Sequence, residues 1–264
     1  MSTLTGVGEF ARGIGREAGA IALRYFRSGI TAASKADTEF DPVTAADLAI
    51  ERHLRDAIRS RYPTHGIVGE ELPDEAADAR ECWVIDPIDG TRGFVLGLPT
   101  WGVLIALMSG GRPVLGLMYQ PLTDDLVYGD GDGAFIERAG GRRPLAVRSA
   151  PTLEEAQLCC TTPAMFDGPR DAAAFARLAA RVRAVRYGTD CYGYASLALG
   201  GAQLVVEGGL KPCDVIPLIP IVEGAGGLVR NWKGGTALGA REVVAAADQS
   251  LLEAALATLA GPGP

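Results

Sequence analysis

Residues 103–147 constrain the fold of this chain more than any other segment, because their apolar residues come in short runs rather than at helical spacing. The runs are separated by turn residues at Gly110-Gly111, Pro121, Gly131-Asp132-Gly133 and Gly140-Gly141. Glycine-rich turns of this kind connect neighbouring antiparallel strands. We therefore predict an antiparallel meander without helices in this segment.

Two amphipathic helices are predicted before the meander. Apolar residues recur at helical spacing over residues 7–26, and this helix is expected to end near Ser28-Gly29. Thr44 is a suitable cap for a second helix, with Asp47 in the position of a capping-box acid. Pro63 then stops that helix. Two short apolar runs follow, at 67–68 and 82–85, and they predict strands.

Strands and helices alternate after Pro151. The predicted strands are Leu158–Thr161, Val185–Tyr187, Gln203–Glu207, Leu228–Arg230 and Val243–Ala246, and the predicted helices are Asp171–Val182, Cys191–Leu199, Asp214–Ala225 and a last helix from Asp248. Pro217 and Pro220 lie inside the third of these helices, so it begins later or carries a kink. We expect one α/β (α+β) domain over residues 1–264, with an N-terminal half of about 1–150 and a C-terminal half of about 151–264.

Composition excludes several classes of protein. The chain has 264 residues, 48% of them hydrophobic, and a formal net charge of -7, which argues against a nucleic-acid partner. Its apolar runs fall far short of the ~20 residues of a membrane-spanning helix. No basic start followed by an apolar block is found, and the five cysteines are scattered. We expect a cytoplasmic protein that acts without a membrane. Only two histidines, His53 and His65, are present, and we interpret both as structural.

Acidic residues follow several of the predicted strands. Glu70 comes after the first short strand, Asp86 and Asp89 come after the second, and Asp214 lies in the C-terminal half. If these carboxylates share a pocket, their mutual repulsion requires cations or protons, and oxygen ligands select Mg²⁺, Mn²⁺ or Ca²⁺ over zinc. Taken alone, the Asp-Pro-Ile-Asp-Gly string of 86–90 is more often an ordinary turn.

The order and spacing of these acids resemble the inositol monophosphatase family of Mg²⁺-dependent phosphomonoesterases. The resemblance covers nearly the whole chain and is carried by Asp41-Pro42-Val43-Thr44-Ala45-Ala46-Asp47, Gly69-Glu70-Glu71, Trp83-Val84-Ile85-Asp86-Pro87-Ile88-Asp89-Gly90-Thr91, and Asp214 with Glu223-Gly224-Ala225-Gly226-Gly227. It implies a layered αβαβα sandwich, a homodimer, and a small-molecule phosphate ester as substrate. It also implies two or three Mg²⁺ ions per subunit, with Mn²⁺ as a possible substitute.

The same resemblance assigns roles to individual residues. The implied metal ligands are Glu70, Asp86 and the Ile88 carbonyl for a first ion, and Asp86, Asp89 and Asp214 for a second. Thr91 corresponds to the residue that orients the attacking water, and Asp47 to the acceptor of its hydroxyl proton. The catalytic set is therefore Thr91, Asp47 and Glu70, and the amides of Gly90 and Thr91 would bind the phosphate.

Two positions depart from the common family pattern: Gly93 stands in place of an Asn, and Cys213 in place of a Trp. The strings Gly188-Thr189-Asp190-Cys191-Tyr192 and Leu210-Lys211-Pro212-Cys213-Asp214 resemble the histidinol-phosphatase branch instead.

That branch implies a substrate with a protonated amine, which Asp190 and Glu207 would hold by charge-assisted hydrogen bonds. The implied substrate-binding set is Asp89, Asp190, Glu207 and Asp214. Three alternatives remain open: Asp190 as an N-cap, a phosphatase for inositol phosphate or another sugar phosphate, and a catalytically silent metal-dependent binding protein.

Overall fold

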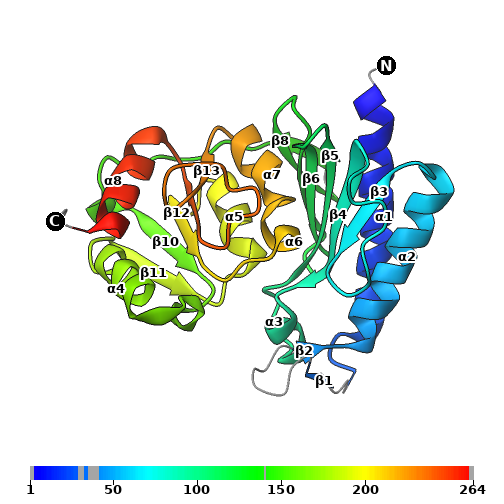
Figure 1. The fold of residues 1–264 in the computed structure, drawn as a ribbon, viewed down its shortest axis with the longest axis horizontal. Coiled ribbons are helices and arrows are strands. Elements are labelled where there is room, and N and C mark those ends of the chain that lie inside the picture. The colour runs from blue at the N-terminus through cyan, green and yellow to red at the C-terminus, as the bar shows by residue number, and fades with distance from the viewer. Residues whose placement is uncertain (1–2, 29–32, 35–41, 140, 262–264) are drawn as a thin grey trace.

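The computed structural model describes residues 3–28, 33–34, 42–139 and 141–261, and its elements are arranged in five layers (Figure 1). Helices α1 (Thr3–Tyr25) and α2 (Ala45–Arg61) form one outer layer, and α4 (Gly168–Ala179) and α8 (Gln249–Ala260) form the other. Helices α5 (Cys191–Ala198), α6 (Pro212–Val215) and α7 (Leu218–Gly224) lie between the two sheets. The expected αβαβα sandwich is thus confirmed.

The first sheet has seven strands in the order β3-β4-β5-β6-β7-β8-β9. Their bounds are Gly66–Gly69, Glu81–Asp89, Gly102–Ser109, Arg112–Gln120, Asp125–Gly129, Ala134–Arg138 and Gly141–Pro144. Each strand from β4 to β9 pairs antiparallel with the next, and no helix interrupts 102–139, so the predicted meander is confirmed for the described residues. A short ribbon of β1 (Ala33–Ser34) and β2 (Pro42–Val43) lies apart from it.

The second sheet has five strands in the order β11-β10-β12-β14-β13. In chain order, β10 to β14 span Gln157–Cys160, Ala184–Tyr187, Leu204–Glu207, Leu228–Asn231 and Val243–Ala246. The strands β10, β11 and β12 are parallel to one another, whereas β14 runs antiparallel to both of its neighbours. The alternation predicted for the C-terminal half produces this mixed sheet, with single-turn 3₁₀ helices at Leu153–Glu155 and Pro163–Met165.

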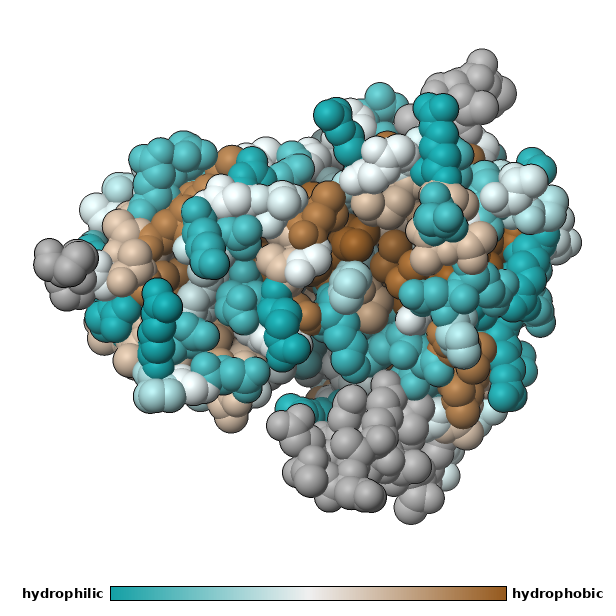
Figure 2. Space-filling model, in the orientation of Figure 1, coloured by the Kyte–Doolittle hydropathy of each residue, from teal (hydrophilic) through white to brown (hydrophobic). Residues whose placement is uncertain are grey.

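The buried apolar residues form three cores. One lies beneath α1 and α2, one surrounds the middle layer and contacts both sheets, and one lies beneath α4 and α8, so both faces of each sheet are buried. In β4, for example, Ile85 faces the core beneath α1 and α2, whereas Val84 faces the core between the sheets. Figure 2 shows hydrophobic side chains at the viewed surface in the middle of the molecule and in smaller areas toward both ends, among mostly hydrophilic ones. Among the described helices, none is both long and apolar enough to cross a membrane.

Two predicted boundaries were wrong near the acids. The strand expected to end at Ile85 continues to Asp89, since a register shift between Asp86 and Asp89 accommodates Pro87 within the ladder. The single helix expected over Asp214–Ala225 is two helices, because Pro217 interrupts it, and the first of them begins earlier than expected.

The capping box of α2 is confirmed: the Thr44 hydroxyl accepts from the amides of Ala46 and Asp47, and Asp47 accepts from the Thr44 amide at 2.8 Å. The histidines make the expected structural contacts, His53 with Glu17 and His65 with Trp83. Asp41, which begins the quoted family motif, lies outside the described residues.

Candidate metal centre and active site

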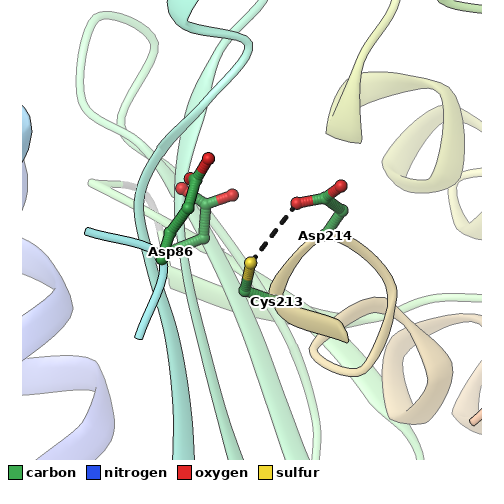
Figure 3. Close-up of side chains that lie close together, drawn as sticks. Asp86, Cys213 and Asp214 are labelled. Carbon is green, nitrogen blue, oxygen red and sulfur yellow. Dashed lines mark hydrogen bonds between the residues drawn. The ribbon is translucent and has the colours of Figure 1, made fainter. Parts of the chain in front are cut away.

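Three carboxylates from distant parts of the chain meet between the first sheet and the middle layer. Glu70 follows β3, Asp86 lies on β4, and Asp214 lies on α6, which packs against β4. Ligand atoms of these three residues and of Cys213 all lie within 4.8 Å of one another. Figure 3 shows Asp86 on its strand facing Cys213 and Asp214 on the opposing helical turn.

The carboxylates disfavour one another's charge. Burial, followed by the charges of Glu70, Asp89 and Asp214, raises the pKa of Asp86 well above its usual range. Burial also raises the pKa of Asp214 to about 6, and the Glu70 charge acts in the same direction. Buried acids that repel one another in this way need a cation or protons. The donor set is mainly carboxylate oxygen and fits a divalent ion such as Mg²⁺ or Mn²⁺.

Asp89 connects this cluster to the N-terminus of α5. Its Oδ2 accepts a hydrogen bond of 2.6 Å from the Cys191 amide, 102 positions further along the chain. Burial, together with the charges of Asp190 and Asp214, raises its pKa well above the usual range. Three of the four acids predicted to converge therefore do so, and Asp89 adjoins them with its carboxylate bound to the first amide of α5.

The two residues predicted to orient the attacking water, Thr91 and Asp47, share no hydrogen bond in the described part of the chain. Thr91 begins α3 (Thr91–Val95), and its hydroxyl donates to the Ile88 carbonyl at 2.9 Å. Asp47 is buried, with one carboxylate oxygen on Thr44 and the other without a hydrogen-bond partner in the described part of the chain. Burial raises the pKa of Asp47 to about 6. Gly90 precedes α3 at φ 85°, a left-handed conformation that glycine adopts readily.

A second acidic group adjoins the first through Asp89. Glu207 ends β12 and is 1% exposed; its Oε1 accepts from the amide and hydroxyl of Thr161 at 3.0 and 3.2 Å. Its Oε2 has no hydrogen-bond partner among the described residues. Burial raises the pKa of Glu207 well above its usual range, and the charges of Asp190 and Asp89 act in the same direction.

Asp190 occupies the N-cap position of α5 but does not act as a cap through its side chain. It has φ 46°, and its carboxylate makes no capping hydrogen bond. Burial raises its pKa to about 6, while the charge of Arg92 lowers it. Since Asp89 holds the Cys191 amide instead, the carboxylate of Asp190 is not engaged at the helix terminus.

Several residues at the site were not assigned from the sequence. Cys213 was noted only as a departure from the family pattern, yet its Sγ lies 3.5 Å from Asp214 Oδ1. Lys211 Nζ lies 3.1 Å from Glu70 Oε1. The position of Lys211, three residues before Asp214 in the sequence, was the signal that could have assigned it to the site. Glu51 and Arg55 of α2 contact the loop that carries Glu70, and helical periodicity gives no sign of this because it concerns only their own helix.

Comparison with known proteins agrees with the fold. The model of the inositol monophosphatase family matches residues 4–261. The bifunctional phosphatase IMPL2 of Arabidopsis thaliana is 40% identical over 82% of this chain, and the match spans 61% of the plant protein.

Two further relatives match over most of their length. The histidinol-phosphatase of Chlorobaculum parvum is 33% identical over 86% of each chain. The solved structure of an inositol monophosphatase from Zymomonas mobilis has a TM-score of 0.86 and 38% identity, covering 98% of this chain and 100% of that one. Sequence, fold and acidic centre lead to one conclusion: the chain belongs to the inositol monophosphatase family of phosphatases.

Proposed function

We propose that this protein is a Mg²⁺-dependent phosphomonoesterase that hydrolyses L-histidinol phosphate to L-histidinol and phosphate, in histidine biosynthesis. The observation that carries the choice of substrate is the second acidic group. Glu207 is buried, one of its carboxylate oxygens has no hydrogen-bond partner among the described residues, and the Asp190 side chain makes no capping hydrogen bond there. A protonated amine beside the phosphate would satisfy both acids, because charge-assisted hydrogen bonds are the strongest available to a buried carboxylate.

In this proposal the residues of the first cluster hold the metal ions. Glu70, Asp86, the Ile88 carbonyl, Asp89 and Asp214 would be the ligands. When bound, two or three Mg²⁺ or Mn²⁺ ions would activate water and neutralise the phosphate. The amides of Gly90 and Thr91 would bind the phosphate oxygens.

The same proposal gives Thr91 and Asp47 a role in proton transfer. Thr91 would orient the attacking water, and Asp47 would accept the proton of the Thr91 hydroxyl. The raised pKa of Asp47, about 6, favours the acceptance of a proton in this buried position.

A second candidate is an inositol phosphate or another small sugar phosphate. The name of the Zymomonas relative, an inositol monophosphatase, favours it. A polyol, however, carries no positive charge for the buried acids to pair with. The proposal also includes a homodimer, on the strength of the family alone, and a cytoplasmic location, which the five scattered cysteines support.

A substrate panel tests these alternatives. Phosphate release is measured with Mg²⁺ from histidinol phosphate, inositol 1-phosphate, glycerol phosphate and fructose 1,6-bisphosphate. We expect kcat/KM to be highest for histidinol phosphate. A preference for inositol phosphate would establish the second candidate, and no release from any ester at saturating Mg²⁺ or Mn²⁺ would favour a catalytically silent metal-dependent protein.

A further inference from the structure

A carboxylate of α2 accepts hydrogen bonds from the loop that follows Glu70. Glu51 is fully buried, and its Oε2 accepts from the Glu71 amide at 2.8 Å while its Oε1 accepts from the Leu72 amide at 3.1 Å. These are the two amides that follow Glu70 directly. One carboxylate therefore fixes the backbone immediately after a predicted metal ligand.

A buried arginine completes this arrangement. Arg55 is 1% exposed, and its Nε donates to Glu51 Oε1 at 2.9 Å. Its two terminal nitrogens donate to the Leu72 carbonyl at 2.9 Å and to Glu75 Oε1 at 2.7 Å. The planar guanidinium thus joins the helix to the loop at Leu72 and at Glu75, and its charge balances that of Glu51.

The packing around the pair leaves little freedom for the loop. A Cβ atom added at Gly69 would lie 2.1 Å from Glu51 Oε1 and 2.7 Å from an Arg55 nitrogen, so only glycine fits before Glu70. At the far end, the backbone of Glu75 exchanges two hydrogen bonds of 2.8 Å with Ile67. Hydrogen bonds therefore join the end of the segment from Gly69 to Glu75 back to β3, and the segment is also attached to α2.

The pair lies in line with a predicted catalytic residue. Asp47, Glu51 and Arg55 are spaced four residues apart, and all three are buried on the same side of α2. Stability alone gives a weak reason for such a pair, because buried ion pairs can often be replaced by apolar side chains at little or no loss. Recognition of two consecutive amides, in contrast, needs the two oxygens of a carboxylate.

We propose that Glu51 and Arg55 are positioning residues, which hold the Glu70 loop in the geometry that binds the metal and keep it in register with Asp47. The proposal rests on the metal site of the proposed function and adds to it two residues that touch neither metal nor substrate. Groups that orient metal ligands in this way change metal affinity or activity by about 10–100-fold when they are altered.

The test measures metal binding without substrate. Mn²⁺ affinity is determined by calorimetry for the full chain and for Glu51→Gln, together with thermal unfolding in the presence of a chelator. We expect Glu51→Gln to bind Mn²⁺ about 10–100-fold more weakly, since Gln can offer only one acceptor oxygen to the two amides. Phosphate release should then need a correspondingly higher Mg²⁺ concentration, and excess Mg²⁺ should restore most of kcat.

Two further variants keep the test decisive if Glu51→Gln folds poorly. Arg55→Lys keeps the positive charge but loses the planar guanidinium with its several donors. The double variant Glu51→Met/Arg55→Met keeps the side-chain volume without the polar contacts. Both should lose Mn²⁺ affinity. Arg59→Gln is the matched control. Arg59 is half exposed and also pairs with Glu75, but it does not contact the Glu71 or Leu72 amide, so the Mn²⁺ affinity of this variant should match that of wild type.

Unchanged Mn²⁺ affinity in the folded variants, with or without lower thermal stability, would overturn the proposal. A failure of the proposed substrate is distinguishable, because the binding measurement involves no ester. If none of the phosphate esters is hydrolysed but the Mn²⁺ affinities follow the expected order, the positioning role stands and the substrate assignment alone is wrong.

Discussion

At the scale of single residues, the acids at the site form two groups that share Asp89. One group, with Glu70, Asp86 and Asp214, consists of oxygen donors within reach of one ion. The other, with Asp190 and Glu207, lies next to it and has no metal-ligand arrangement of its own among the described residues. In the proposed function, the first group would supply the metal-dependent chemistry and the second would select the substrate.

Asp190→Ala should change the choice of substrate. A charge-assisted hydrogen bond contributes about 1.5–3 kcal/mol, so kcat/KM for histidinol phosphate should fall roughly 10–150-fold. For inositol or glycerol phosphate the same change removes a half-buried acid beside the proposed phosphate site and should leave kcat/KM unchanged or higher. The measurement is the ratio between the two esters. Equal losses on both would show that Asp190 does not contact the amine.

Asp86→Asn should be the most damaging change among the predicted ligands. Asp86 is assigned to both ions, it is 1% exposed, and Glu70, Asp89 and Asp214 all act on its pKa. We expect phosphate release to fall near the background rate, as it should in wild type after exhaustive chelation. Assays at increasing Mg²⁺ and Mn²⁺ check this. Near-native activity in Asp86→Asn would contradict its assignment to both ions.

At the scale of elements, one buried side of α2 carries both Asp47, the proposed proton acceptor next to the Thr44 cap, and the pair Glu51 and Arg55, which binds the Glu70 loop. Its first turn holds Asp47 through the Thr44 capping box, and its next two turns hold the Glu70 loop through Glu51 and Arg55. From the other side of the site, β4 supplies Asp86 and Asp89, and α6 supplies Asp214. A helix, a strand and a short helix from separate layers therefore fix the acidic centre.

Thr44→Ala should therefore affect both stability and activity. Loss of an N-cap of this type costs about 0.5–2 kcal/mol of unfolding free energy, and Asp47 would also lose one of its two hydrogen-bond donors, the Thr44 hydroxyl, while the backbone amide of residue 44 remains. Asp248→Ala is the control, because Asp248 caps α8 far from the site by accepting from the Leu251 amide at 2.9 Å. Both variants should unfold earlier in urea, but only Thr44→Ala should lower kcat. Equal kcat values would separate the cap from catalysis.

At the scale of the whole molecule, the middle layer joins the two sheets. Helix α7 packs on β6, β7 and β8 on one side and on β13 on the other, and one continuous apolar core spans both interfaces. The acidic centre lies where this layer meets the first sheet (Figure 1). Separation of the sheets would therefore also dismantle the site.

We predict a single cooperative unfolding transition for the whole chain. The two sheets share the core around α7, so neither can lose its partner without exposing apolar surface. Differential scanning calorimetry at saturating Mg²⁺ should give one peak, with calorimetric and van't Hoff enthalpies in agreement. Two resolved peaks would mean that the N-terminal and C-terminal halves are separate domains.

The stabilising effect of metal should grow as pH rises. The pKa of Asp214 is raised from 3.8 to about 6 in the folded chain, so protonation stabilises the metal-free protein at low pH, and this stabilisation is lost as pH rises through about 6. Mg²⁺ replaces the protons, so its increment in Tm should be small near pH 5 and larger near pH 7.5. Thermal unfolding with chelator and with Mg²⁺ measures both. An increment independent of pH would contradict this account.

Much of the local structure follows from the sequence alone, because it depends on neighbours along the chain. Spacing of apolar residues identifies α1, α2 and the strands of the meander, and the cap at Thr44 is readable from the residues that follow it. Boundaries near prolines were less accurate. The strand through Pro87 depends on a bulge, which residue spacing does not report, whereas Pro217 indicated an interruption of the helix but not the positions at which the two helices begin and end.

The elements, the family and the identity of the acids are readable from the residues in order, since helical and strand periodicity and the motif strings are local properties. How the acids are held is visible only in the folded structure. It placed Asp89 on the amide of Cys191, brought Cys213 to the metal centre, and set Glu51 beneath the Glu70 loop. These contacts join residues that the chain separates by 20 or more positions, so they arise from the packing of layers, which a local pattern cannot encode.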